Sequence, residues 1–228
     1  MSGFFRSSVG QKFLMSITGM FLLVFLLVHS IANSFLLFGP DAFNKVSHFM
    51  ETNPLIQIMQ FVLAAGFIIH ITWSVILSLQ NMKARPQKYE VMVQAHNSKW
   101  ASRNMFILGS LIAIFLVMHL MNFFWKMKFT GSDLYTDVNV EGVIMHNAYA
   151  LVSGLFIDPE LGLVYSLLYI LGAVFLGLHL YHGFWSSFQT LGLSNNVWRI
   201  RLERIGIVYT LFVTMIFIII PLYFLIFK

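Results

Sequence analysis

The sequence predicts an all-α polytopic membrane protein with five transmembrane helices, in a single domain over residues 1–228. Hydrophobic residues make up 58% of the chain and charged residues only 10%, whereas about a quarter of a soluble domain is charged. Apolar stretches of the roughly 20 residues needed to cross a bilayer recur five times. Lipid offers peptide groups no hydrogen-bond partner, so each stretch should be a helix. The stretches cover residues 13–38, 54–80, 104–125, 163–188 and 205–227.

The segments between these stretches alternate in charge. Basic residues gather before the first stretch, between the second and third, and between the fourth and fifth: Arg6, Lys12, Lys83, Arg85, Lys88, Lys99, Arg103, Arg199, Arg201 and Arg204. The other two segments carry most acidic residues: Asp41, Glu51, Asp133, Asp137, Glu141, Asp158 and Glu160. The positive-inside rule therefore predicts a cytoplasmic N-terminus and an outer C-terminus. The net charge of +5 reflects this topology and does not indicate nucleic-acid binding.

Several further features limit what the chain can be. Cysteine is absent, which excludes disulfides, cysteine-ligated clusters and covalent C-x-x-C-H haem attachment. The N-terminal "MSGFFRSSVGQK" shows no removable signal peptide. In the outer loop, residues 141–156 are predicted to form a short helix at the membrane surface, ended by Pro159. The inner loop, residues 81–102, is either a docking surface or a solvated connector.

Histidine is the ionisable residue that enters the apolar stretches. His29, His70 and His119 lie on the first three stretches and His179 and His182 on the fourth, whereas the fifth has none. An ionisable side chain within a span is a functional-site hypothesis. The alternative for each is a neutral imidazole hydrogen-bonded to a neighbouring helix.

Counting from the outer ends at 1.5 Å per residue divides these histidines into two layers. His29 and His119 lie roughly 10–15 Å deep, and His70 and His179 roughly 24 Å deep. Alternate helices of a four-helix bundle lie diagonally opposite each other. The two histidines of each layer can therefore face each other across the core. Two opposed imidazoles suit a haem with two axial ligands, whereas zinc takes four ligands.

Two glycines accompany the inner histidines on the same helical faces. Gly66 precedes His70 by four residues and Gly183 follows His179 by four. They either leave room for a porphyrin or tighten helix packing. His179 and His182 lie one turn apart and cannot both bind one iron from the same side, and depth alone does not decide between them.

The chain resembles the di-haem cytochrome b membrane-anchor subunits of succinate:quinone oxidoreductases and quinol:fumarate reductases, closest to the b558 subgroup. The resemblance covers the whole chain. It rests on five helices with histidines on the first four, and on "KFLMSITG" (12–19), "ARPQKY" (84–89), "WASRNM" (100–105) and "HLYHGFW" (179–185).

The resemblance implies two haem b groups, with His70 and His179 as ligands of the inner haem and His29 and His119 of the outer one. The fourth-helix ligand of the family is followed by a glycine four residues later, which selects His179 over His182. It also implies a respiratory complex II in the bacterial cytoplasmic membrane. Its partners would be a flavoprotein, an iron–sulfur protein and menaquinone, and the whole complex could form a dimer.

Other residues are candidates by position. Glu51, His48, Tyr149 and Tyr165 lie near the outer end, where a quinone must exchange protons. At the inner end, Ser16, Arg103 and Lys12 could meet haem propionates, and His182 is expected to lie beside the inner haem or its propionates. Some relatives carry a glutamate two residues before the fourth-helix ligand. Here Gly177 takes that place, and the sequence predicts electrogenic electron transfer.

Two other classes of membrane protein fit the sequence less well. The di-haem subunit of nitrate reductases takes ligands from its fifth helix, but residues 205–227 contain no histidine. A histidine-bearing transporter would be expected to show internal repeats and helices interrupted near the midplane, and neither pattern is visible.

Overall fold

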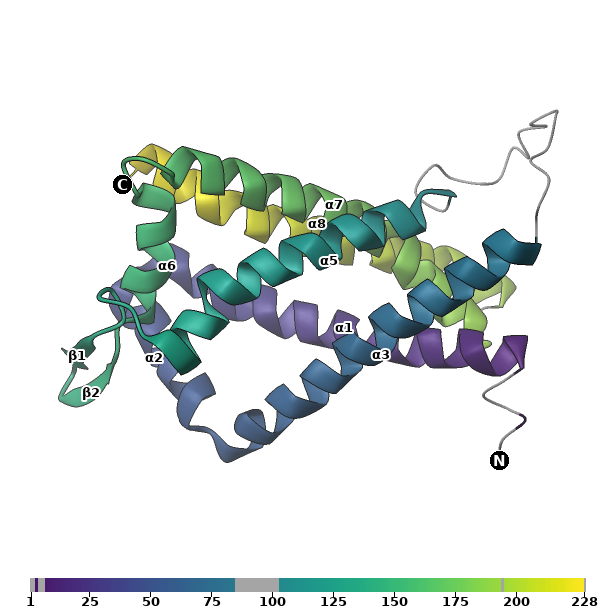
Figure 1. The fold of residues 1–228 in the computed structure, drawn as a ribbon, viewed down its shortest axis with the longest axis horizontal. Helices are drawn as coiled ribbons and strands as arrows, with labels where there is room; N and C mark the ends of the chain where they lie inside the picture. The colour runs from purple at the N-terminus through teal and green to yellow at the C-terminus, as the bar shows by residue number, and fades with distance from the viewer. Residues whose placement is uncertain (1–2, 4–6, 85–102, 194, 228) are drawn as a thin grey trace.

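The computed structural model describes residues 3, 7–84, 103–193 and 195–227. Within that part of the chain, five helices are long and apolar enough to cross a membrane, which confirms the predicted all-α polytopic fold. The helices run back and forth along one long axis, and a smaller group of elements caps one end (Figure 1). In chain order the elements are α1 (Ser8–Ser34), the 3₁₀ helix η1 (Phe35–Phe38), α2 (Pro40–Thr52), α3 (Pro54–Ala84), α5 (Met105–Asn122), the π turn η2 (Lys126–Thr130), β1 (Asp137–Val140), β2 (Val143–His146), α6 (Ala148–Ile157), α7 (Gly162–Thr190) and α8 (Asn196–Phe227).

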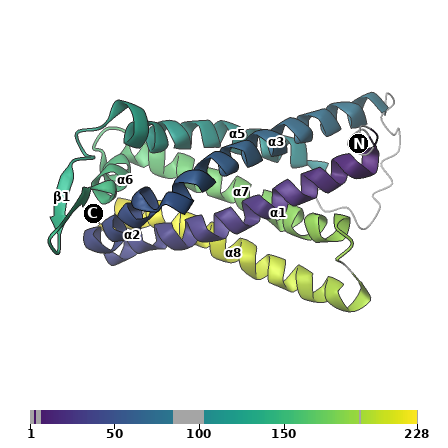
Figure 2. The same cartoon turned by 90° about the horizontal axis from the view of Figure 1, so that it is seen from below.

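Four of the long helices form a square. α1 packs against α3 and α7, and α5 packs against the same two helices, so α1 and α5 are diagonal, as are α3 and α7. α8 lies outside the square, where it packs most extensively against α7 and also contacts α1 (Figure 2). The two histidine layers require the first long helix to lie opposite the third and the second opposite the fourth. This is the arrangement of α1 with α5 and of α3 with α7.

The lengths of the long helices differ from the sequence prediction mainly in the last one. α8 begins at Asn196, nine residues before the predicted start at 205. The apolar run begins late because Arg199, Arg201 and Arg204 interrupt it, but a charged helical segment can continue beyond the bilayer core. The correction places Glu203 inside the helix, where it lies 3.9 Å from Arg199.

The outer loops contain more regular structure than the sequence predicted. Residues 40–52 form α2, with Pro40 at its first turn and Asp41 beside it, two residues that favour a helix start. Residues 137–146 form an antiparallel hairpin with Val140 paired to Val143. The predicted surface helix at 141–156 is therefore wrong over its first part and correct from Ala148 onward. Of the inner loop at 81–102, residues 85–102 lie outside the described part.

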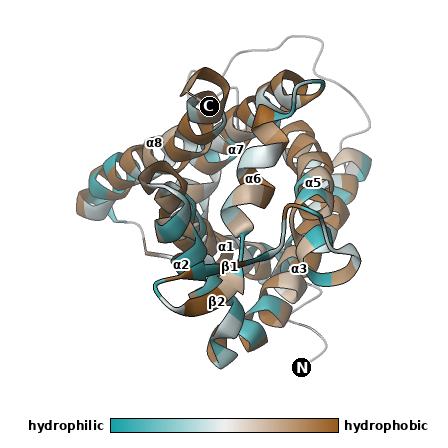
Figure 3. Cartoon of the chain, turned by 90° about the vertical axis from the view of Figure 1, so that its left-hand side faces the viewer, coloured by the Kyte–Doolittle hydropathy of each residue, from teal (hydrophilic) through white to brown (hydrophobic). Residues whose placement is uncertain are grey.

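The capping elements are joined by buried amide groups. Asn44 of α2 is 2% exposed. Its Oδ1 accepts from the Tyr149 backbone N–H at 2.8 Å, and its Nδ2 donates to Asn147 at 3.2 Å. Asn147 in turn caps α6 by accepting from Ala150. Figure 3 looks onto this end, with α6 lying across it.

The tightest apolar core lies beneath this cap. It joins residues of η1, α2, α6, α7 and α8: Leu36, Phe43, Ala148, Tyr149, Val152, Phe156, Tyr169, Ile220 and Phe224. Along the rest of the bundle, α3 and α5 bury little of their apolar surface inside the protein. Apolar side chains exposed along membrane-spanning helices are the surface that lipid covers.

Candidate functional site

The interior of the square holds the histidines at two levels. His29 on α1 and His119 on α5 face each other at the level nearer the cap, with ring centres 5.8 Å apart and planes at 88°. Two imidazoles that bind one metal ion from opposite sides, with metal–nitrogen bonds of about 2 Å, have ring centres about 6 Å apart. The separation of this pair fits that arrangement.

Aromatic rings enclose this outer pair. His29 stacks on Phe25 at 5.2 Å, and His119 lies 5.3 Å from Phe123 and 6.0 Å from Tyr169. The Tyr169 hydroxyl accepts from Asn122 at 3.2 Å. An apolar wall of this kind excludes water from whatever the two imidazoles bind, and tunes its chemistry through the low local polarity.

The inner level holds His70 on α3 and His179 on α7. Both His70 and His182 lie close enough to His179 to interact with it electrostatically. The Nδ1 atom of His179 is buried and has no hydrogen-bond partner among the described residues. A buried ring nitrogen of this kind is costly to leave without a partner.

Small residues surround the inner level. A Cβ atom added at Gly19 would lie 3.6 Å from Cε1 of His70, and one at Gly109 would lie 3.8 Å from Cε1 of His179. Beside Gly183 there is open space, with nothing within 4 Å. Gly66 behaves differently, because a Cβ there would be 2.8 Å from the Phe21 ring. Gly66 thus accommodates a neighbouring side chain in this structure, whereas Gly183 leaves room.

This donor set suits haem better than a bare metal ion. Among the described residues, no group of three or more His, Cys, Asp or Glu side chains is arranged so that it could hold a metal ion. Haem iron needs only two axial ligands from the protein, since the porphyrin supplies the other four. The two separated histidine pairs, with small residues around the inner one, offer the ligands that two haem groups would need: His29 with His119, and His70 with His179.

Residues predicted near the inner end are placed as follows. Ser16 on α1 is 6% exposed, whereas Lys12 and Arg103 are exposed. His182 lies partly buried one turn beyond His179. The N-terminus lies at the same end of the bundle (Figure 1).

At the capped end, Glu51 is the centre of a polar cluster that the sequence did not reveal. It lies 3.0 Å from Nδ1 of His146, accepts from the Tyr135 hydroxyl at 3.4 Å and is 3.7 Å from Nζ of Lys128. Burial acts to raise the pKa of Glu51, but the hydrogen bond and charge of His146, the Lys128 charge and the Tyr135 hydroxyl outweigh it, so the pKa lies below its usual range. Glu51 is therefore a carboxylate at neutral pH.

The other predicted outer candidates differ in exposure. Tyr149 belongs to the apolar core, and Tyr165 packs partly buried against it. His48 is half-buried on α2, and its carbonyl oxygen accepts from Thr52. Glu51 is thus the member of this group with an extended set of polar partners.

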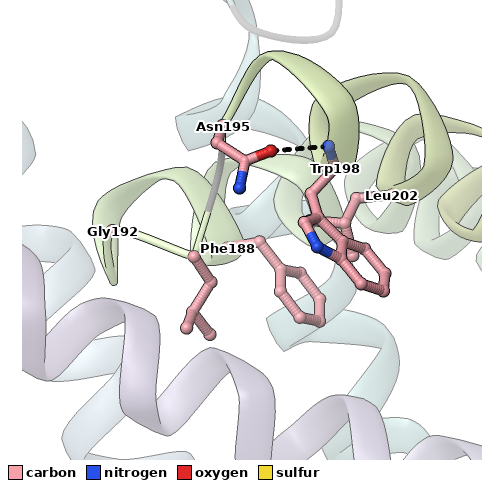
Figure 4. A pocket seen from close by; sticks show the side chains of 6 residues that line it. Phe188, Gly192, Asn195, Trp198 and Leu202 are labelled. Carbon is pink, nitrogen blue, oxygen red and sulfur yellow. Dashed lines mark hydrogen bonds between the residues drawn. The ribbon is translucent and has the colours of Figure 1, made fainter.

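A separate groove of about 440 Å³ lies at the turn between α7 and α8 (Figure 4). Asn195 lines it, and Oδ1 of Asn195 accepts from the Trp198 backbone N–H at 2.8 Å. The Arg201 guanidinium lies 5.3 Å from the centre of the Trp198 ring. The described residues that line this groove include no histidine, so it is distinct from the histidine pairs. Its lining residues are Phe188, Gly192, Leu193, Asn195, Trp198 and Leu202.

Comparison with protein-family models, curated proteins and solved structures finds no match to this chain. The resemblance to di-haem cytochrome b subunits therefore stays a prediction from the sequence motifs and the histidine placement.

Proposed function

We propose that the chain is the di-haem membrane subunit of a succinate:quinone oxidoreductase or quinol:fumarate reductase, and that it carries electrons across the bilayer. The observation that supports this proposal most is the arrangement of four histidines on four helices. They form two diagonal pairs at two levels of one bundle. An electron path across the bilayer requires redox groups at different depths, and each histidine pair would hold one such group.

The four histidines of the bundle, and the phenylalanines beside them, have defined roles in this proposal. His29 and His119 hold the outer haem, and His70 and His179 hold the inner one. When bound, these groups supply one-electron transfer. The chain itself would hold the imidazoles of these four histidines in place, and the rings of Phe25 and Phe123 keep water from the outer pair.

The two ends of the bundle suit different partners. The basic end would face the cytoplasm and dock the iron–sulfur subunit, which receives electrons from, or passes them to, a flavoprotein that interconverts succinate and fumarate. The capped end would meet menaquinone. There Glu51, with His146 and Tyr135 in contact, is the candidate for exchanging protons with the quinone. The expected location is a bacterial cytoplasmic membrane.

Spectra of the purified complex test this function. The reduced-minus-oxidised spectrum should show b-type haem, and the haem should be extractable by acidified organic solvent, because the chain has no cysteine to attach it. Adding a menaquinol analogue should reduce that haem, and added fumarate should reoxidise it when the partner subunits are present. A preparation that contains the folded chain but no haem would overturn the proposal.

A further inference from the structure

The hydroxyl of Thr18 contacts one of the inner histidines. Thr18 lies on α1, and its Oγ1 is 3.2 Å from Nδ1 of His70 on α3. The adjacent residue, Gly19, is where an added Cβ would lie 3.6 Å from the same imidazole. This turn of α1 therefore lies directly against His70.

The direction of the hydrogen bond follows from the other contacts of the hydroxyl. Oγ1 of Thr18 lies 2.9 Å from the Leu14 carbonyl oxygen and 3.1 Å from that of Met15. Carbonyl oxygens only accept, so the single hydroxyl proton of Thr18 is directed at them. The hydroxyl can then contact His70 only as an acceptor, and Nδ1 of His70 must carry the proton.

A proton on Nδ1 leaves the Nε2 lone pair of a neutral imidazole free to bind a metal. Histidines that bind metals almost always donate their other N–H to a neighbouring oxygen, which fixes the ring and makes the ligand more basic. The contact at Thr18 has this form. By contrast, Nδ1 of His179 has no such partner among the described residues.

We propose that Thr18 is a positioning residue that holds His70 in its Nδ1–H form, and thereby sets the strength of one axial ligand of the inner haem. This inference rests on the proposed function. It makes the two inner ligands unequal, because α1 fixes the tautomer of His70, whereas no equivalent contact reaches Nδ1 of His179 within the described part of the chain. The inner haem should thus respond to a substitution on a helix that supplies neither of its ligands.

Redox titration of the complex tests this inference. Thr18→Val keeps the side-chain shape but removes the acceptor. The less basic imidazole should bind ferric iron about tenfold less tightly relative to ferrous iron, which raises the midpoint potential of one haem by about 59 mV. The other haem should be unchanged, and Thr18→Ser should restore the wild-type value. The matched control is Ser30→Ala, which removes a buried hydroxyl that donates to Leu27 in the same helix.

A second measurement does not depend on haem. In haem-free protein with ¹⁵N-labelled histidine, the His70 signal is assigned as the one that disappears in His70→Gln. In the wild-type protein this signal should show a proton on Nδ1. Thr18→Val should abolish that preference for Nδ1. Unchanged potentials of both haems in Thr18→Val, or a wild-type His70 with its proton on Nε2, would overturn the role of Thr18. A wild-type complex without haem would instead overturn the proposed function, and the nitrogen signal would still decide the tautomer.

Discussion

Glu51 illustrates how single side chains hold the capping elements together. It lies at the end of α2 and contacts His146 of β2, Tyr135 before the hairpin and Lys128 of η2. Three segments distant in sequence therefore converge on one carboxylate. Burial opposes the charged form, but the cationic and hydroxyl partners stabilise it more, so the pKa of Glu51 lies below its usual range.

This lowered pKa gives the cap a defined response to acid. A carboxyl group with a lowered folded-state pKa stabilises the fold above its unfolded pKa, near 4.3, and loses that contribution as pH falls through the folded value. Thermal unfolding in detergent should therefore occur at lower temperature as pH falls from about 5. Glu51→Gln should weaken this dependence, whereas Glu160→Gln, on an exposed residue, should leave it intact. Equal acid sensitivity in Glu51→Gln and wild type would contradict this account.

The residue-level contacts of the candidate site were only partly predictable. The histidines stood out in the sequence because ionisable residues are rare in apolar stretches. Thr18 did not, since a threonine in a membrane helix commonly bonds to its own backbone. The contact between Glu51 and His146 joins residues 95 positions apart, and no local pattern indicates such a pairing.

At the scale of elements, glycines determine how closely the long helices approach. A Cβ at Gly177 of α7 would lie 2.5 Å from Oγ1 of Thr214 on α8, and one at Gly172 would lie 2.5 Å from the Phe115 ring of α5. Both glycines are buried. Gly177 thus has a packing role between α7 and α8.

Gly177→Ala should push α7 and α8 apart. Overpacking of this kind typically costs 1–3 kcal/mol, so we expect a loss of about 2 kcal/mol in the free energy of unfolding. It would be measured by denaturation in mixed micelles. Val174→Ala, on the exposed face of the same helix, should change stability by well under half that amount. A Gly177→Ala protein as stable as Val174→Ala would show that the two helices are not in close contact there.

Hydropathy predicted the five spans because membrane composition leaves few alternatives for a run of 20 apolar residues. It failed where helices leave the bilayer. The start of α8 is rich in arginine, and α2 is amphipathic and too short to count as a span. Half of the hairpin at 137–146 is apolar, with Val140 and Met145 buried and Val143 and Ile144 exposed, so its apolar second strand was attributed to the helix that follows it.

At the scale of the whole molecule, the acidic residues are confined to the ends. In the described chain, none of the first four spans contains Asp or Glu, and Glu203 of α8 lies near that helix's first turns, beside Arg199. A carboxylate path for protons through the bundle is therefore not available from these residues.

Electron transfer through the complex should consequently be electrogenic. Proteoliposomes that contain the complex and turn over quinol and fumarate should develop a membrane potential, detectable with a voltage-sensitive dye and abolished by an ionophore. Gly177→Glu introduces a carboxylate into the span. Although the glutamate would crowd Thr214, any complex that still turns over should develop a smaller potential. Turnover by wild type without a potential would refute the electrogenic assignment.

The pairing of histidines across the bundle is the central claim, and counting haems in single and double variants tests it most directly. Wild type should bind two haems per chain, and His119→Ala should bind one. Adding His29→Ala should cause no further loss, because both residues serve the same haem, whereas adding His179→Ala should remove the second. His48→Ala, outside the bundle, should retain both. Two haems in His119→Ala, or none in the His29/His119 double variant, would contradict the pairing.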